Sequence, residues 1–101
     1  MSAEHHYFFV RGHTPPTVEV DSEASAVYVR FKRAKVAKTV PRTADIMHIA
    51  VDLDSNNEVV GIEAVGITSF SLKNIFQWAR VKTPDMDFSR AQYKPAAGIP
   101  A

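Results

Sequence analysis

One stretch of sequence, Asp45 to Val65, reads DIMHIAVDLDSNNEVVGIEAV and decides the fold. In its first half apolar residues recur at every second position, namely Met47, Ile49, Val51 and Leu53. This is the period of a half-buried strand. The Asp-Ser-Asn-Asn run at 54–57 indicates a turn, because Asn and Asp tolerate positive φ and hydrogen-bond their own backbone. The sequence therefore predicts a hairpin of strands 46–53 and 58–65.

The segments before this hairpin predict further strands. Residues 26–32 alternate between apolar and polar side chains in the same way, and 17–20 and 35–40 are shorter candidates. We expect 35–40 at or near a sheet edge, because Pro41 cannot donate a hydrogen bond to a neighbouring strand.

The segment after the hairpin changes period. Residues 71–82 place apolar side chains at i, i+3, i+4 and i+7, which is one face of a helix. That face consists of Leu72, Ile75, Phe76 and Ala79. Ser69 or Ser71 can cap its start, and Pro84 stops it.

These elements together predict an α+β fold. It is a four- or five-stranded, mostly antiparallel β-meander with one C-terminal helix packed on its apolar face. The sheet residues expected to face the helix are Val27, Val29, Phe31, Ile49, Val51, Val60 and Ile62. The opposite face is expected to present Tyr28, Arg30, His48, Asp52, Val59 and Glu63. Because that face is half apolar, we expect a second subunit to cover it.

The chain has 101 residues, which is the size of one domain. We expect an extended segment at 1–16, the domain at 17–82 and a flexible tail at 83–101. The absence of cysteine excludes disulfides, thiolate metal sites and cysteine nucleophiles. The start of the chain has no basic residue before an apolar run, and no stretch is long enough to span a membrane, so a cytoplasmic protein is expected.

Positive charge is concentrated in one part of the chain although the net charge is only +1. Six of the twelve basic residues lie in an acid-free stretch: Arg30, Lys32, Arg33, Lys35, Lys38 and Arg42. Such a cluster can contact the phosphates of a nucleic acid. It can equally be a solvated hairpin whose lysines protect an edge strand from pairing.

The acidic and histidine residues do not predict an enzyme. Asp52 and Glu63 can lie on one face of the hairpin, as a hydrolytic carboxylate pair requires, but Glu63 can also pair with Arg30 or His48 across strands. The four histidines, His5, His6, His13 and His48, lack a recognised metal-ligand spacing. We therefore assign no catalytic residue, metal or cofactor.

Aromatic and apolar residues outside the predicted core are candidates for a subunit contact. They are Tyr7, Phe8, Phe9, Tyr28, Val59, Trp78, Phe88 and Tyr93.

Two runs of residues resemble a known family. DSEASAVYVRF at 21–31, with VDLD at 51–54 and VVGIE at 59–63, resembles the landmarks of the domain-of-unknown-function 2283 family of small bacterial proteins. The resemblance covers about residues 17–70. It implies a fold and no established chemistry, and some members of that family look like antitoxin partners of small toxins.

The sequence thus favours a small, non-enzymatic interaction module that self-associates, with a dimer as the expected assembly. The alternative is an antitoxin-like or regulatory protein. It would bind a small toxin or another protein through residues 83–101, or nucleic acid through the basic stretch. A small hydrolase acting through Asp52 and Glu63 is the third hypothesis. No membrane partner is expected.

Overall fold

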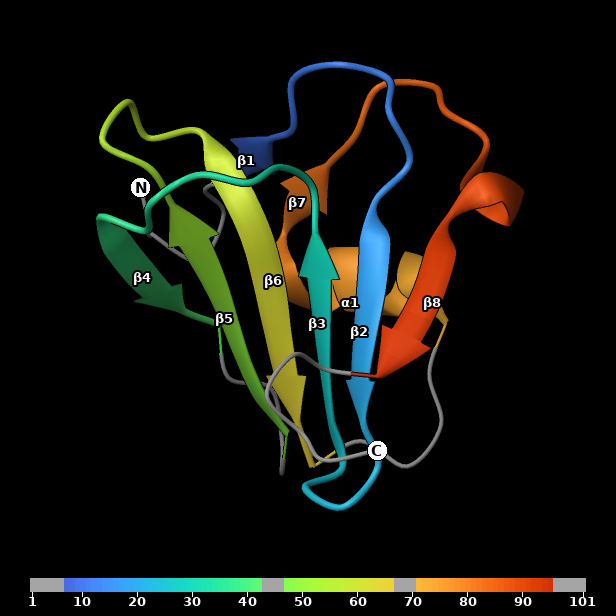
Figure 1. Cartoon of the computed structure of the whole chain (residues 1–101). Coiled ribbons are helices and arrows are strands. Elements are labelled where there is room, and N and C mark those ends of the chain that lie inside the picture. Colours follow the sequence, from blue (N-terminus) through green and yellow to red (C-terminus); the bar gives the residue numbers. More distant parts are fainter. Residues whose placement is uncertain (1–6, 43–46, 67–70, 96–101) are drawn as a thin grey trace.

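A six-stranded sheet with one helix behind it forms the body of the computed structural model, which describes residues 7–42, 47–66 and 71–95 (Figure 1). Its strands are β2 (Thr17–Asp21), β3 (Ala26–Arg30), β4 (Lys38–Pro41), β5 (His48–Leu53), β6 (Val59–Val65) and β8 (Gln92–Pro95). Their order is β4-β5-β6-β3-β2-β8, and every pair is antiparallel except β2–β8. Short strands β1 (Phe8–Phe9) and β7 (Val81–Lys82) form a separate parallel pair. The predicted α+β class is confirmed, with more strands than expected and with β6 inserted beside β3.

The predicted hairpin is confirmed as β5 and β6, and its turn is built by Asp54. One oxygen of the Asp54 carboxylate, Oδ1, accepts hydrogen bonds from the backbone N–H groups of Asn56, at 2.8 Å, and Glu58, at 3.0 Å. Asn57 takes the left-handed conformation with φ 63°, which Asn tolerates better than most residues. The β2–β3 turn uses the same chemistry, because Asp21 accepts from the backbone N–H of Ala24.

A β-bulge in the hairpin changes which valine faces the core. The register shifts between Asp52 and Leu53, so that Leu53 pairs with Val59. Val59 is therefore buried in the main core, and its predicted place on the polar face is wrong. Val60, predicted to face the helix, is buried but is not part of that core cluster. A bulge adds one residue to one strand, which ends strict alternation.

Helix α1 (Leu72–Ala79) is shorter than the predicted 71–82. The Ser71 hydroxyl caps its start by accepting from the backbone N–H of Asn74, at 3.2 Å. It ends where Arg80 turns left-handed with φ 55°, and Val81 and Lys82 then form β7. In the described residues no helix is both long and apolar enough to cross a membrane.

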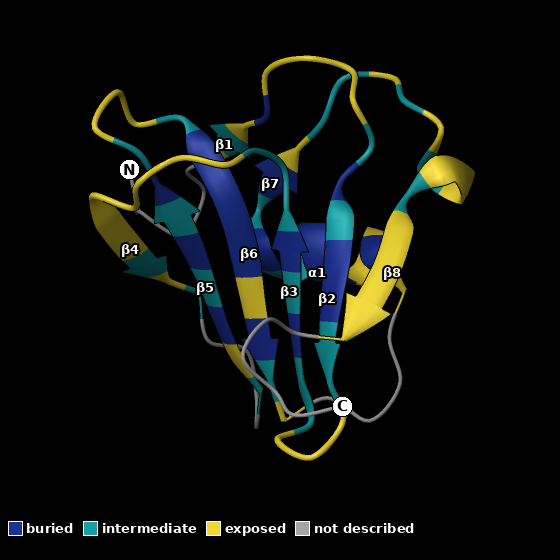
Figure 2. Cartoon of the chain, in the orientation of Figure 1, coloured by how far each residue is buried: buried dark blue, intermediate teal, exposed yellow. Residues whose placement is uncertain are grey.

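The core lies between the sheet and α1, and buried residues fill the central strands (Figure 2). All four predicted helix residues are buried there: Leu72, Ile75, Phe76 and Ala79. Each large apolar side chain buried in this way contributes about 1.5–3 kcal/mol. Helix α1 contacts β5, β6 and β7, which leaves the ends of the inner sheet face to other segments.

The predicted boundaries at 16 and 82 do not separate the terminal segments from the sheets. Phe8 and Phe9 of the expected lead-in pair with β7. Within the expected flexible tail, 83–101, residues 92–95 form β8 and pair with β2 at the sheet edge. The Gln-Tyr-Lys-Pro run of β8 has no alternating apolar pattern that would predict a strand. It becomes a strand only by pairing with β2, which is distant in the sequence. Residues 1–6 and 96–101 lie outside the described residues.

The outer sheet face is held together by polar side chains that reach across strands. The Tyr28 hydroxyl on β3 donates to Asp52 Oδ2 on β5, at 2.8 Å, across the intervening strand β6. The hydroxyl of Thr39 on β4 donates to the other Asp52 oxygen, at 2.6 Å. Tyr28 can reach Asp52 because Gly61, opposite Asp52 on β6, has no side chain in the path.

Gly61→Ala should therefore disturb this face. The added Cβ would lie 2.5 Å from the outer ring atoms of Tyr28, so the ring must move and release Asp52. We expect the free energy of unfolding, measured by urea denaturation, to fall by about 1–3 kcal/mol. In a Tyr28→Ala background the clash is absent and Ala suits a strand better than Gly, so no loss is expected there. Equal losses in both backgrounds would contradict the close-approach explanation.

Candidate functional site

The structure divides the predicted basic patch, and Arg30 is already neutralised. Its Nε donates to Glu19 Oε2 at 2.7 Å and its Nη2 to Oε1 at 3.3 Å. Glu19 is only 6% exposed, and the Arg30 guanidinium holds the pKa of Glu19 below its ordinary value of 4.5. The same guanidinium lies 4.8 Å from the centre of the Tyr28 ring. Arg30 therefore stabilises the outer sheet face and does not supply an excess positive charge.

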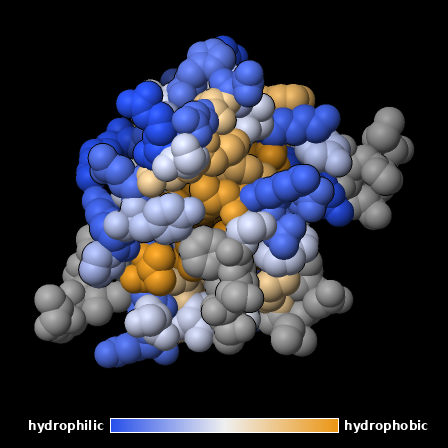
Figure 3. All heavy atoms as spheres, turned by 90° about the vertical axis from the view of Figure 1, so that its right-hand side faces the viewer, coloured by the Kyte–Doolittle hydropathy of each residue, from blue (hydrophilic) through white to orange (hydrophobic). Residues whose placement is uncertain are grey.

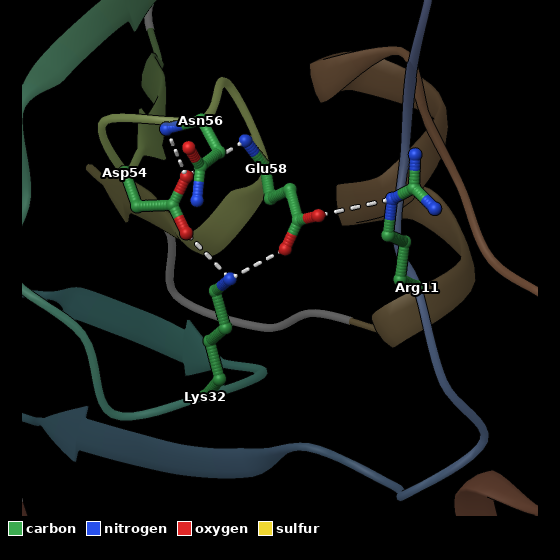
Figure 4. A network of polar contacts seen from close by, with 5 residues as sticks. All are labelled: Arg11, Lys32, Asp54, Asn56 and Glu58. Carbon is green, nitrogen blue, oxygen red and sulfur yellow. Dashed lines mark hydrogen bonds and ion pairs between the residues drawn. The ribbon is translucent and has the colours of Figure 1, made fainter.

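Lys32 is neutralised in a second network, at the β5–β6 turn (Figure 4). Its Nζ lies 2.5 Å from Asp54 Oδ2 and 2.8 Å from Glu58 Oε1. These two carboxylates raise the pKa of Lys32, and Lys32 in turn lowers the pKa of Asp54. Arg11 contacts the other Glu58 oxygen at 3.1 Å, which connects the amino-terminal segment to the turn.

The other four basic residues of the patch remain at the surface or line a groove. Arg33 and Lys35 are exposed in the connection before β4. Lys38 and Arg42 line a groove at the β4 edge of the sheet, the edge groove. Its volume is about 860 Å³, and it lies between the amino-terminal segment, β4 and the β5–β6 turn. Its other polar and aromatic lining residues include Tyr7, Phe9, Arg11, Asn56, Asn57 and Glu58.

The edge groove thus brings together two predicted sets, the basic stretch and the amino-terminal aromatics. Phe9 is 64% exposed and Tyr7 is 43% exposed. Phe8 is partly buried against the core, and the Arg42 guanidinium lies 5.0 Å from the centre of its ring. Burial lowers the pKa of Arg42, and the positive charge of Arg80 lowers it further. Arg42 and Arg80 therefore lie close enough for their charges to act on each other.

A second groove, the flank groove, opens on the side of the molecule that Figure 3 faces. Its volume is about 1020 Å³, and its apolar lining consists mainly of Leu72, Phe76, Val81, Phe88 and Tyr93. Figure 3 shows hydrophobic side chains gathered on this side between hydrophilic ones. The rings of Phe76 and Phe88 lie 5.2 Å apart, which continues the core toward the surface. Tyr7 lines both grooves.

The remaining predicted interface residues are not at either groove. Trp78 packs partly buried against the core, and Val59 is fully inside it. Tyr28 is half-buried in the polar network of the outer face. Of the predicted interface aromatics, those that stay exposed or line a groove are therefore Tyr7, Phe9, Phe88 and Tyr93, with Phe8 beneath Arg42.

The register places Asp52 and Glu63 on the same face of the hairpin, and Asp52 is engaged by other side chains. Both oxygens of Asp52 accept hydrogen bonds, from Tyr28 and Thr39. Glu63 is exposed and pairs in register with Ala50 and Tyr28, one step along the sheet from Asp52. Its predicted partner Arg30 is bound to Glu19 instead, and His48 is exposed. Within the described ranges no three His, Asp or Glu residues lie close enough to hold a metal ion.

Sequence reasoning missed Glu19 and Arg11. Glu19 lies opposite Tyr28 and one diagonal step from Arg30, so the alternation of 17–20 against 26–30 could have indicated the pair. Arg11 gave no signal, because it lies outside any periodic segment and meets Glu58 only through the fold.

Glu19→Gln tests how much the Glu19–Arg30 pair stabilises the fold and how that stabilisation changes with pH. Because the pKa of Glu19 is below 4.5 in the folded state, its stabilisation is present above that pH and is lost as the pH falls through the folded pKa. At about pH 7 we expect the variant to lose about 1–3 kcal/mol in the free energy of unfolding, since Arg30 loses a charged partner. The difference from wild type should narrow at about pH 3.5.

The matched control is Glu63→Gln, an exposed acid on the same sheet face. Urea denaturation of this variant should change by no more than about 0.5 kcal/mol at either pH. A difference between Glu19→Gln and wild type that stays constant with pH would show that the pair does not contribute through its charge.

Comparison with known proteins does not test the family resemblance of the sequence. No family model matches the chain, and neither the curated proteins nor the solved structures contain a significant match. The resemblance to the domain-of-unknown-function 2283 family therefore stays a prediction.

Proposed function

We propose that this chain is a small, non-enzymatic interaction module that self-associates through the flank groove. The observation that carries the proposal is that buried core residues form the floor of the groove and an exposed aromatic residue lies at its rim. Leu72, Phe76 and Val81 belong to the core cluster and also line the groove. Tyr93, at the rim, is 58% exposed. Apolar surface of this kind gains free energy when a partner removes it from water.

The charges around the flank groove favour a second copy as the partner. Lys73 and Lys82 line it, and the exposed acids Asp85 and Asp87 lie in the segment between two other lining residues, Thr83 and Phe88. In a twofold contact each copy presents the same patch to the other. A patch with both signs of charge can then place lysines of one copy near aspartates of its partner.

The outer sheet face supports a binding role over hydrolysis. A general acid or nucleophile must have a carboxylate oxygen directed at the substrate. Asp52 uses both oxygens to hold β4 and β3 to β5. The antitoxin-like or regulatory alternative, through residues 83–101 or the basic stretch, stays a prediction.

Sedimentation velocity tests the proposal. Wild-type protein should form a dimer as its concentration rises, and Tyr93→Ser should weaken the dimer by about tenfold or more, as expected when an exposed aromatic side chain is buried by the partner. The matched control is Val36→Ser, since Val36 is 41% exposed but lies outside the flank groove. A wild-type protein that stays monomeric at high concentration would overturn the proposal, and so would equal weakening by both substitutions.

A further inference from the structure

The edge groove differs from the flank groove in its chemistry, since it combines cations with exposed rings. Three of its lining residues are cations, Arg11, Lys38 and Arg42, and Glu58 is the one acid among them. Glu58 is already held by Lys32 and Arg11. Among the described residues, Lys38 has no ion-pair partner. Lys38 therefore brings positive charge to the groove that suits an anionic ligand.

The cations of the groove come from separate parts of the chain. Arg11 follows β1, Lys38 begins β4, and Arg42 follows β4 directly. The positive charge of Arg80 acts on Arg42 as well. Several phosphates spaced along one chain would match cations spaced along a groove.

The aromatic residues supply the second half of the recognition. Phe9 is the most exposed large hydrophobic residue of the described chain, at 64%, and Tyr7 is 43% exposed. Exposed rings beside cations are the arrangement on which the bases of single strands stack, while the cations follow the backbone. Bases in a duplex already stack on each other and leave their flat faces inaccessible to such rings.

The polar lining fits the same ligand. Asn56 and Asn57 are exposed at the β5–β6 turn and line the groove opposite β4. An Asn side chain both donates and accepts hydrogen bonds, as the edge of an unpaired base requires. The turn itself is held in place by Lys32, Asp54 and Glu58, so these amides are presented from a fixed loop (Figure 4).

We propose that the edge groove binds single-stranded nucleic acid, with phosphates on Lys38 and Arg42 and bases stacked on Phe9 and Tyr7. This site lies apart from the proposed dimer contact except at Tyr7, which lines both grooves. Binding should be weak and dependent on salt. With two or three phosphates contacted, log Kobs against log salt should have a slope of about −1.4 to −2.

The test is fluorescence anisotropy of a fluorescein-labelled deoxythymidine 12-mer with the full chain at low salt. Lys38→Ala should weaken binding by severalfold, and it should also weaken the binding of inorganic polyphosphate, which carries charge without bases. Phe9→Ala should weaken binding of the 12-mer by about tenfold and leave polyphosphate binding unchanged. Lys35→Ala, an exposed lysine of the same basic stretch outside the groove, is the control and should change neither.

Any one of five results would overturn the proposal, and the first four concern the variants and the nucleic-acid probes. These four are no binding of the 12-mer by folded wild-type protein, equal effects of Lys35→Ala and Lys38→Ala, a Phe9→Ala effect that is the same for polyphosphate, and tighter binding of a 12-base-pair duplex. Competition by poly-glutamate as strong as that of unlabelled 12-mer would also overturn it and would indicate an acidic protein ligand. Circular dichroism confirms that each variant is folded. Tyr93→Ser should leave 12-mer binding intact, which separates this test from that of the dimer.

Discussion

The structure depends on one constraint, which is that a single short helix must cover the inner face of a six-stranded sheet. Eight residues make a helix about 12 Å long. Six strands spaced by about 4.8 Å span about 24 Å between the outer strand axes. Helix α1 packs on β5 and β6, and the β1–β7 pair adds cover beside it. The edge groove and the flank groove are lined in part by residues of this core, Leu53 in the first and Leu72, Phe76 and Val81 in the second.

The outer face of the sheet differs from the inner face, because no described helix or strand covers it (Figure 1). Its stability comes from polar contacts that connect neighbouring strands. Tyr28 and Thr39 both donate to Asp52, and Arg30 binds Glu19. A satisfied polar network resists slippage of the register, because a shift would leave charged groups without partners. We place the two proposed binding surfaces at the margins of the core because these polar groups of the outer face already bind one another.

The sequence predicted the parts of the fold that depend on local patterns. The hairpin at 48–65 and the buried face of α1 follow from period and turn chemistry within about a dozen residues. Strand β8 could not be foreseen, since its pairing with β2 joins residues more than seventy positions apart. The sequence also did not predict the bulge beside Val59 or the early end of α1 at Arg80. In both places tertiary packing selects one local conformation among several that the sequence allows.

The candidate sites were foreseen as two separate sets of residues and not as grooves. Alternation could place Lys38 on an edge strand, but not beside Phe9, which lies twenty-nine positions earlier. Charge counting likewise overestimated the basic patch, because the partners of Arg30 and Lys32 come from other strands. Both errors arise from contacts between distant segments.

The most direct test of the central claim is a dilution series followed by methyl-resolved NMR. If the short helix leaves part of the core as a contact surface, the methyl signals of Leu72 and Val81 should shift as the protein concentration rises. Those of the fully buried Val29 and Ile62, which do not line either groove, should stay constant. Leu72 and Val81 signals that do not change across the series would contradict the claim, as would a uniform shift of all four.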